Sequence, residues 1–266
     1  MCANALQGLK TLNLKNSSVF IRFAFLFLLF TFLSGCQTQQ TKPVIETPQV
    51  KPIVKTEVAI KPIVKPKPKK RVRPLPPNSL QKSSSFIFGK VYADHANSFY
   101  CRCNFDENLS TTPESCGIYN KELPNAHRST RIELESLIPI HWLKSTSKLA
   151  ANDLQNLFPV NGQLRGNRRA TPFIETAPEH TKEYGLCKVI DSTKGRQPPA
   201  RIQGDIARIY FYMKFFYGIK GQPQDEVLLK RWAQEDPVDA WEKKRNARIA
   251  RIQKVGNPYV EWKKIR

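Results

Sequence analysis

A proline- and lysine-rich segment over residues 36–85 constrains the fold of this chain most, because such a composition cannot build a hydrophobic core. In this segment Lys and Pro alternate with Val and Ile, and the run Val50–Lys55 is echoed by Ile60–Lys65. Proline-rich chain adopts an extended form that rises about 3.1 Å per residue, so the segment is expected to be a semi-rigid spacer. One folded domain is therefore expected, over residues 86–266.

The first 35 residues have the pattern of an export signal. Basic residues precede the apolar run Phe23–Phe32, which is too short for a comfortable membrane span. The run is followed by Leu33-Ser34-Gly35-Cys36, which is similar to a bacterial lipoprotein signal and would make Cys36 the lipidated first residue. An uncleaved anchor and an ordinary secretory signal are the alternatives. In bacterial lipoproteins the residue after the lipidated cysteine directs sorting, and Gln37 at this position favours the outer membrane. The expected location is therefore the periplasm or the cell surface.

Four further cysteines follow the signal, at positions 101, 103, 116 and 187. An even number in an exported chain predicts two disulfides. Of the possible pairings, the one between Cys101 and Cys103 is sterically the least favourable. A structural zinc site is the rival interpretation, although the spacing does not match the usual paired-ligand pattern.

The net charge of +21 indicates a polyanionic partner, because Lys and Arg neutralise phosphates and release counterions. Nucleic acid and anionic lipid are both candidates, and the excess charge could also serve only to solvate the surface. The spacer is itself basic, so it could contact lipopolysaccharide, peptidoglycan or nucleic acid, or simply be solvated.

Periodicity predicts several elements of the folded domain. The alternation over Phe86–Tyr92 predicts a strand, and the following region to Arg128 is expected to form loops with short strands. Apolar residues from Ile202 to Tyr217 follow helical spacing, so a buried amphipathic helix is expected there, with its aromatic residues in the core. Two further helices are predicted over 225–234 and 237–255.

Two segments, Arg131–Pro139 and Asn152–Pro159, resemble the active-site core of the bacterial endonuclease I family. The resemblance continues through Val91–His95, Ser98–Cys103, Glu114–Gly117, Gly204–Arg208 and Arg251–Pro258. It implies a mixed α+β domain that contains a ββα-metal motif of the His-Me finger type and C-terminal helices. It also implies non-specific cleavage of nucleic acid using a divalent cation such as Mg²⁺.

The chain departs from the family at the catalytic positions. Glu135 matches the metal-binding glutamate, but Ser136 stands where the family has the histidine base, and a serine hydroxyl has no useful basicity near neutral pH. Arg165 occupies the position of the asparagine ligand, and a guanidinium has no lone pair to donate. The insert that carries the family's phosphate-contacting arginine is also missing.

Two hypotheses address this altered site. Arg165 could form an ion pair with Glu135 in the place of the metal, or His141, Asn161 and Asn167 could rebuild a ligand set. The candidate nucleic-acid-binding residues are Arg131, Arg165, Arg168 and Arg169.

Three functions follow from these features. The chain could be a metal-dependent endonuclease with weakened or lost activity, a catalytically silent DNA-binding module tethered to the envelope, or a structural envelope lipoprotein. DNA is preferred to RNA as the partner, Mg²⁺ is the expected cofactor of an active enzyme, and a monomer is expected.

Overall fold

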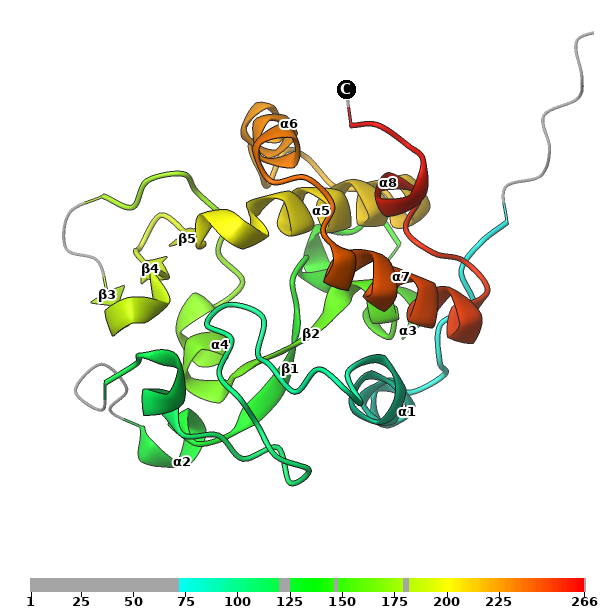
Figure 1. Ribbon diagram of the computed structural model, residues 1–266. Coiled ribbons are helices and arrows are strands. Elements are labelled where there is room, and N and C mark those ends of the chain that lie inside the picture. Colours follow the sequence, from blue (N-terminus) through cyan, green and yellow to red (C-terminus); the bar gives the residue numbers. More distant parts are fainter. Residues whose placement is uncertain (1–71, 120–124, 146–147, 179–181, 266) are drawn as a thin grey trace, which may run out of the picture. The chain divides into compact units, whose positions relative to one another are not determined.

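The structure is a computed structural model that describes residues 72–119, 125–145, 148–178 and 182–265 (Figure 1). These residues form helices and two small sheets, which agrees with the predicted α+β class. The predicted export signal, Cys36 and most of the predicted spacer precede residue 72 and lie outside the described residues. Within the described ranges, no helix is long and apolar enough to span a membrane.

The described part begins with helical structure where a strand was predicted. Helix α1 spans Leu80–Phe86, starts at the capping residue Ser79 and continues as a π-helical turn over Ile87–Val91. The predicted strand over 86–92 is therefore wrong, and the last residues assigned to the spacer are helical. Ile87 and Val91 are fully buried and lie four residues apart, which suits one face of a helix as well as the alternation of a strand.

A two-stranded sheet followed by a helix forms the centre of the fold. Strand β1, Ile132–Ser136, pairs antiparallel with β2, Leu157–Asn161, so that Ile132 lies opposite Asn161 and Glu135 opposite Phe158. Helix α4, Gly162–Arg168, follows β2 at once, because the side chain of Asn161 accepts hydrogen bonds from the amides of Gln163 and Leu164 and caps the helix. The resulting β1-β2-α4 unit has the ββα order that the resemblance implies.

The C-terminal half is mainly helical. It contains α5, Gln203–Tyr217; α6, Glu226–Glu235; α7, Ala240–Gln253; and α8, Pro258–Glu261. The first three confirm the predicted helices, and the buried Tyr210 and Tyr212 of α5 confirm that its aromatic residues contribute to the core. The smaller elements are α2, Ala126–Ser129; α3, Lys148–Ala151; and the sheet of β3, Lys182–Glu183; β4, Ile190–Asp191; and β5, Arg196–Gln197.

Two disulfides hold the loops that precede β1, one within these loops and one to the segment before β4. Cys101 pairs with Cys187, 86 residues away, and Cys103 pairs with Cys116, 13 residues away. We call these the long and the short disulfide. They confirm the predicted number of disulfides, and Cys101 and Cys103 do not pair with each other, in agreement with the expectation that this pairing is the least favourable.

Candidate functional site

Glu135 lies on β1 and is buried, with 5% of its surface exposed. The hydroxyl of Tyr100 donates to Glu135 Oε1 at 2.7 Å, and Nη1 of Arg168 donates to the same oxygen. Arg168 is itself 2% exposed and donates through Nη2 to the carbonyl of Leu137 at 2.7 Å. Its guanidinium also lies over the ring of Phe173 at 4.1 Å. The glutamate that matches the family's metal ligand is therefore part of a buried ion pair.

Tyr100 supports this ion pair as a neutral donor. Burial, and after it the negative charge of Glu135, raise the pKa of the Tyr100 hydroxyl. The hydroxyl therefore stays protonated and donates a hydrogen bond to Glu135. Sequence reasoning missed Tyr100 as a site residue, although it stands inside the Ser98–Cys103 motif that carries part of the resemblance.

Arg165 pairs with Glu133 and not with Glu135, so the hypothesis that it takes the metal's place beside Glu135 is wrong. Nη1 of Arg165 lies 2.7 Å from Glu133 Oε2. Arg128 and Arg131 contact the same carboxylate at 2.8 and 3.1 Å. We call Arg128, Arg131 and Arg165 the arginine cluster. Its three guanidiniums surround one carboxylate, which leaves two positive charges uncompensated within the group.

Burial alone would raise the pKa of Glu133, but hydrogen bonds from Arg128, Arg165 and Arg131 hold it below the ordinary value. Glu133 is therefore ionised at neutral pH. Its carboxylate holds the arginine cluster together while Arg131 and Arg165 remain about half exposed, at 48% and 46% of their side-chain surface.

Two glycines at α4 make room for this cluster. A Cβ atom at Gly166 would lie 2.4 Å from Nη1 of Arg128, and one at Gly162 would lie 2.8 Å from both Glu133 Oε1 and the carbonyl of Arg128. Side chains at these positions would displace the arginine or the glutamate. The helix surface thus forms a recess in which Arg128 and Glu133 meet.

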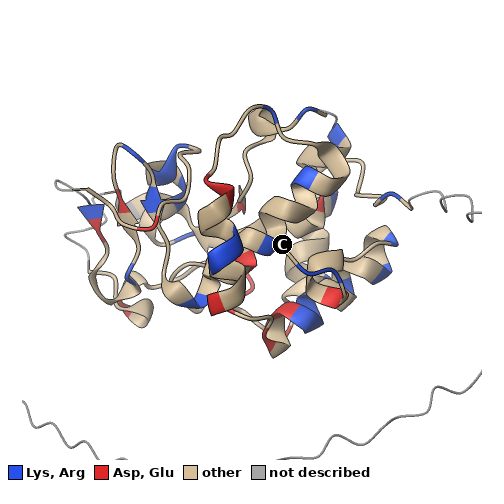
Figure 2. Cartoon of the chain, turned by 90° about the horizontal axis from the view of Figure 1, so that it is seen from above, with Lys and Arg blue, Asp and Glu red and all other residues tan. Residues whose placement is uncertain are grey.

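Of the arginines predicted to bind nucleic acid, Arg131, Arg165 and Arg169 are exposed. Arg168 is buried against Glu135 and is unavailable, so its inclusion was wrong. The sequence analysis missed Arg128 as a candidate nucleic-acid-binding residue, although it follows His127 and lies three residues before Arg131. Basic residues occur on helices and loops throughout the described part (Figure 2), so the cluster is distinguished by its shared carboxylate and not by charge alone.

The residues present do not fit a divalent cation at Glu135. Its second oxygen, Oε2, is buried without a hydrogen-bond partner, but its first is already neutralised by Arg168. Within the described ranges, no group of three or more His, Cys, Asp or Glu side chains could hold a metal ion.

The residues proposed to rebuild the ligand set make other contacts. Asn161 caps α4 and bonds to the carbonyl of Ser129. Asn167 bonds to Gln163 at 2.9 Å and to the hydroxyl of Tyr184 at 2.7 Å.

Neither Ser136 nor His141 stands out as a general base. Ser136 ends β1, where its neighbour Glu135 points to the opposite face because successive strand residues alternate. His141 is exposed in a 3-10 turn over Ile140–Trp142, and its ring lies edge-on to that of Trp142 at 6.2 Å. The exposed guanidiniums of the arginine cluster are chemically suited to phosphate groups.

Comparison with known proteins gives consistent matches. The family model described as Endonuclease I matches residues 81–263. The periplasmic deoxyribonuclease of Aeromonas hydrophila is 33% identical over 195 residues, which cover 65% of this chain and 81% of that protein. Endonuclease-1 of Buchnera aphidicola subsp. Baizongia pistaciae is 33% identical over 64% of this chain and 78% of its own length. An extracellular ribonuclease of Bacillus subtilis is 31% identical over 46% of this chain and half of its own length.

Proposed function

Because this chain belongs to the endonuclease I family, we propose that it binds nucleic acid through the arginine cluster and that its phosphodiester hydrolysis is weakened or lost. The observation that carries the proposal is the contact of Arg165 with Glu133 at 2.7 Å. A positive side chain that stands in place of a neutral ligand adds affinity for phosphate and removes a metal contact.

Binding of this kind reads the phosphate backbone and not the bases. Guanidiniums bind phosphate oxygens in a bidentate way, and each neutralised phosphate releases counterions. Affinity should therefore fall steeply with salt, should not depend on sequence and should not require Mg²⁺. We expect DNA to be preferred to RNA, since the periplasmic relative from Aeromonas hydrophila, which matches 65% of this chain, is described as a deoxyribonuclease.

The reduced hydrolysis follows from Ser136 and Glu135 together. A missing general base commonly costs a factor of about 10² to 10⁴ in rate. Glu135, held by Arg168 and Tyr100, would have to give up a buried ion pair before it could bind a cation. These two losses act on different parts of the reaction, so they would multiply.

A working nuclease with a rearranged site is the second candidate. It is favoured by one observation, the buried Oε2 of Glu135 that lacks a hydrogen-bond partner. A small shift of β1 or of Arg168 would offer this oxygen to Mg²⁺. The two candidates share an affinity for nucleic acid and differ in their use of metal.

We also propose that the protein is exported and held at the envelope by lipid on Cys36, with residues 36–85 as a tether and the domain as a monomer on the periplasmic side or the cell surface. An outer-membrane anchor follows from Gln37. Two disulfides suit an oxidising compartment, and relatives are described as periplasmic or extracellular. Labelling with a radioactive fatty acid tests the anchor, because Cys36→Ser should abolish incorporation.

The function is tested by incubating the purified protein with supercoiled plasmid, with Mg²⁺ and with EDTA, and by measuring both cleavage and retardation. We expect retardation in EDTA at least as strong as in Mg²⁺, and little cleavage. Glu135→Gln separates the candidates if circular dichroism shows that the variant is folded under the assay conditions. Mg²⁺-dependent cleavage by the parent that the folded variant lacks would establish a working site and refute the silent binding module. Restoring the family residues with Ser136→His and Arg165→Asn should raise cleavage and weaken retardation, while Arg251→Gln on the exposed part of α7 serves as the control.

A further inference from the structure

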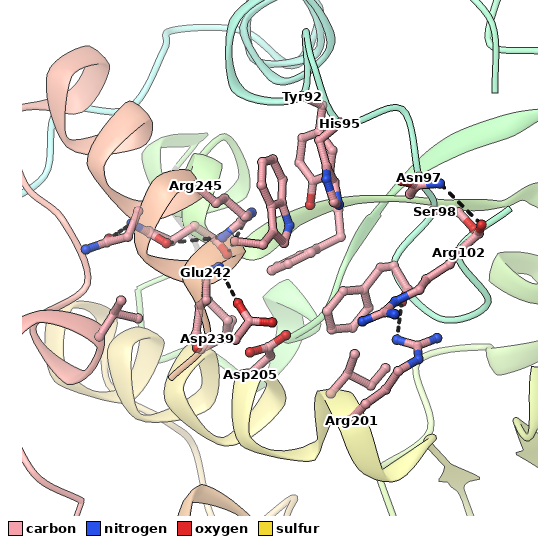
Figure 3. A pocket seen from close by; sticks show the side chains of 18 residues that line it. Tyr92, His95, Asn97, Ser98, Arg102, Arg201, Asp205, Asp239, Glu242 and Arg245 are labelled. Carbon is pink, nitrogen blue, oxygen red and sulfur yellow. Dashed lines mark hydrogen bonds between the residues drawn. The ribbon is translucent and has the colours of Figure 1, made fainter. Parts of the chain in front are cut away.

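The carboxyl groups in the pocket between α5, α7 and the loop around Arg102 are engaged within the fold (Figure 3). Nη2 of Arg208 lies 3.1 Å from Asp205 Oδ1, and its Nε lies 2.6 Å from Glu242 Oε1. A different part of the domain, around Trp262 at the end of α8, leaves large apolar side chains open to solvent.

The exposed indole of Trp262 stands on a fixed backbone. Trp262 follows the last residue of α8, and 73% of its surface is exposed. Its amide donates to the carbonyl of Pro258 at 2.9 Å. Asn257 caps α8, is fully buried and donates through Nδ2 to the carbonyl of Arg208 at 3.1 Å. The helix that presents the indole to solvent is therefore anchored in the domain.

Further apolar side chains surround this indole. Trp262 lines a surface hollow together with Val72, Phe215 and Phe216, and Val72 is 69% exposed. The rings of Phe215 and Phe216 meet edge to face, with their centroids 4.9 Å apart. A single exposed apolar residue needs no explanation, whereas a group that lines one hollow marks a place of interaction.

Lysines stand at the edge of these apolar groups. Lys254 lines the same hollow, and Lys263 and Lys264 line a second hollow that Trp262 shares. The ammonium group of Lys263 lies 3.9 Å from the centre of the Phe215 ring. Lysine stems cover apolar surface in this way while the charge stays in water. We define the tryptophan patch as Val72, Phe215, Trp262, Lys254, Lys263 and Lys264.

The patch has a net positive charge. Among the described residues that line the two hollows, Glu261 is the one carboxylate, and its Oε1 accepts from Nδ2 of Asn246 at 3.0 Å. Three lysines therefore face one acidic group. Exposed tryptophan and phenylalanine with lysines beside them are typical of surfaces that lie at the boundary between lipid headgroups and acyl chains.

The chain that carries the predicted spacer and Cys36 joins the described domain at this patch. Val72 is the first described residue, and the chain after it is held on α7, because the amide of Leu75 donates to the carbonyl of Gln253 at 2.9 Å. A tether turns the face to which it is attached toward its anchor. Lipid on Cys36 would thus favour an orientation in which the tryptophan patch faces the membrane.

We propose that the tryptophan patch docks on an anionic phospholipid surface, with the indole of Trp262 among the headgroups and the three lysines against lipid phosphates. The inference builds on the proposed anchor at Cys36, and acyl chains together with a basic patch hold a protein more firmly than either does alone. No member of the arginine cluster occurs among the described residues that line the two hollows, so docking does not engage that cluster.

A nucleic-acid strand is the rival partner, because bases stack on exposed aromatic rings and lysines bind phosphates. Two observations favour lipid. The patch includes the aliphatic Val72, which offers no ring for stacking, and the chain that leads to Cys36 begins at the same residue.

The test places the full chain with vesicles of phosphatidylethanolamine and phosphatidylglycerol, in which phosphatidylglycerol carries brominated acyl chains that quench tryptophan on contact. The sequence has four tryptophans, at positions 142, 232, 241 and 262, and none in residues 1–71, so quenching reports on the domain and not on the anchor. Trp142 and Trp232 are buried. We expect quenching in these vesicles, much weaker quenching by brominated phosphatidylcholine, and loss of quenching in Trp262→Phe.

Lysine variants measure the charged part of the contact. Lys254→Gln combined with Lys264→Gln keeps the indole and should lower the docking constant, obtained from the quenched fraction, about 25-fold, since each lysine near an anionic surface contributes about fivefold. Lys182→Gln combined with Lys194→Gln changes two exposed lysines outside the patch and should leave the docking constant unchanged. Circular dichroism confirms that both variants are folded.

Flotation of the vesicles in about 0.5 M NaCl separates the patch from the anchor, because salt screens the lysines and leaves acyl chains inserted. A chain that quenches at low salt but does not float at high salt supports the patch and refutes the anchor. The proposal is overturned if anionic vesicles do not quench Trp262, whether or not the chain floats. It is also overturned if Trp262→Phe leaves the quenching unchanged, or if plasmid DNA displaces Trp262 from the vesicles, which would favour a nucleic-acid site.

Discussion

The substitution Glu135→Gln tests whether Glu135 now stabilises the fold or still serves as a metal ligand. Glutamine keeps the shape of the side chain and an oxygen that can accept from Tyr100 and Arg168. It removes the negative charge that faces Arg168, whose side chain is only 2% exposed. If Glu135 is a structural residue, the variant should be markedly less stable, with or without Mg²⁺.

The size of the expected loss in stability follows from the burial of the ion pair between Glu135 and Arg168. Removal of one partner from a buried ion pair typically costs about 3 to 5 kcal/mol, because it leaves an uncompensated charge. Arg168 keeps the carbonyl of Leu137 and the ring of Phe173, which lowers the cost. The glutamine amide, however, would place a donor where Glu135 Oε2 has no partner. We expect a loss of about 3 kcal/mol in the free energy of unfolding.

The assay is unfolding of the oxidised protein in urea, followed by circular dichroism. Adding Arg168→Met to Glu135→Gln should recover part of the loss, since an apolar side chain of similar length removes the unpaired charge. Glu107→Gln, at an exposed position, should change stability by less than about 0.5 kcal/mol. If Mg²⁺ stabilises the parent and Glu135→Gln both removes that effect and costs no stability in EDTA, Glu135 is a metal ligand and the reasoning is refuted.

Three further predictions concern the same domain. Replacing any member of the arginine cluster by Gln should weaken DNA binding and reduce the slope of log affinity against log salt by about one, whereas Arg251→Gln should not, as measured by fluorescence anisotropy. Glu133, whose pKa is lowered, stabilises the fold fully above the ordinary carboxyl pKa of about 4.3, and this contribution is lost as the pH falls through its lower folded value. Glu133→Gln should therefore flatten the acid side of the stability curve in urea unfolding. Replacing both cysteines of the long disulfide by Ser should lower the free energy of unfolding by about 4.6 kcal/mol, and the same change at the short disulfide by about 2.9 kcal/mol. These values come from the loop entropy over 86 and 13 residues, and equal losses would contradict this account.

The helices were predictable because their apolar residues recur with helical spacing over long runs. The segment Phe86–Tyr92 was not, because seven residues are too few to separate the two periods. Its buried members, Ile87 and Val91, satisfy helical spacing, and the turn continues directly from α1. The capping residue Ser79 was the available sign of that helix, but it stands inside the proline- and lysine-rich segment.

The site was predictable in its residue types and not in its pairings. The sequence identified Glu135, Ser136 and Arg165, but the partner of Glu135 depends on how α4 lies along β1. Two strand residues on one face are about 6.6 Å apart, and three helix residues rise about 4.5 Å. Arg165 therefore forms an ion pair with Glu133, and Arg168 forms a second, parallel ion pair with Glu135. Tyr100, 35 residues before Glu135, could be placed only by the three-dimensional fold.

These two ion pairs explain how the catalytic positions could change while the domain kept its fold. The inner pair, Glu135 with Arg168, is buried and holds β1 to α4 without a metal. The outer pair, Glu133 with Arg165, is open to solvent and adds charge where the family has a neutral ligand. Added charge binds the phosphates of substrate and transition state alike, and uniform binding of this kind does not speed the chemical step. Under the proposed function, arginine gained beside a site that lacks a base would favour holding the polymer over cutting it.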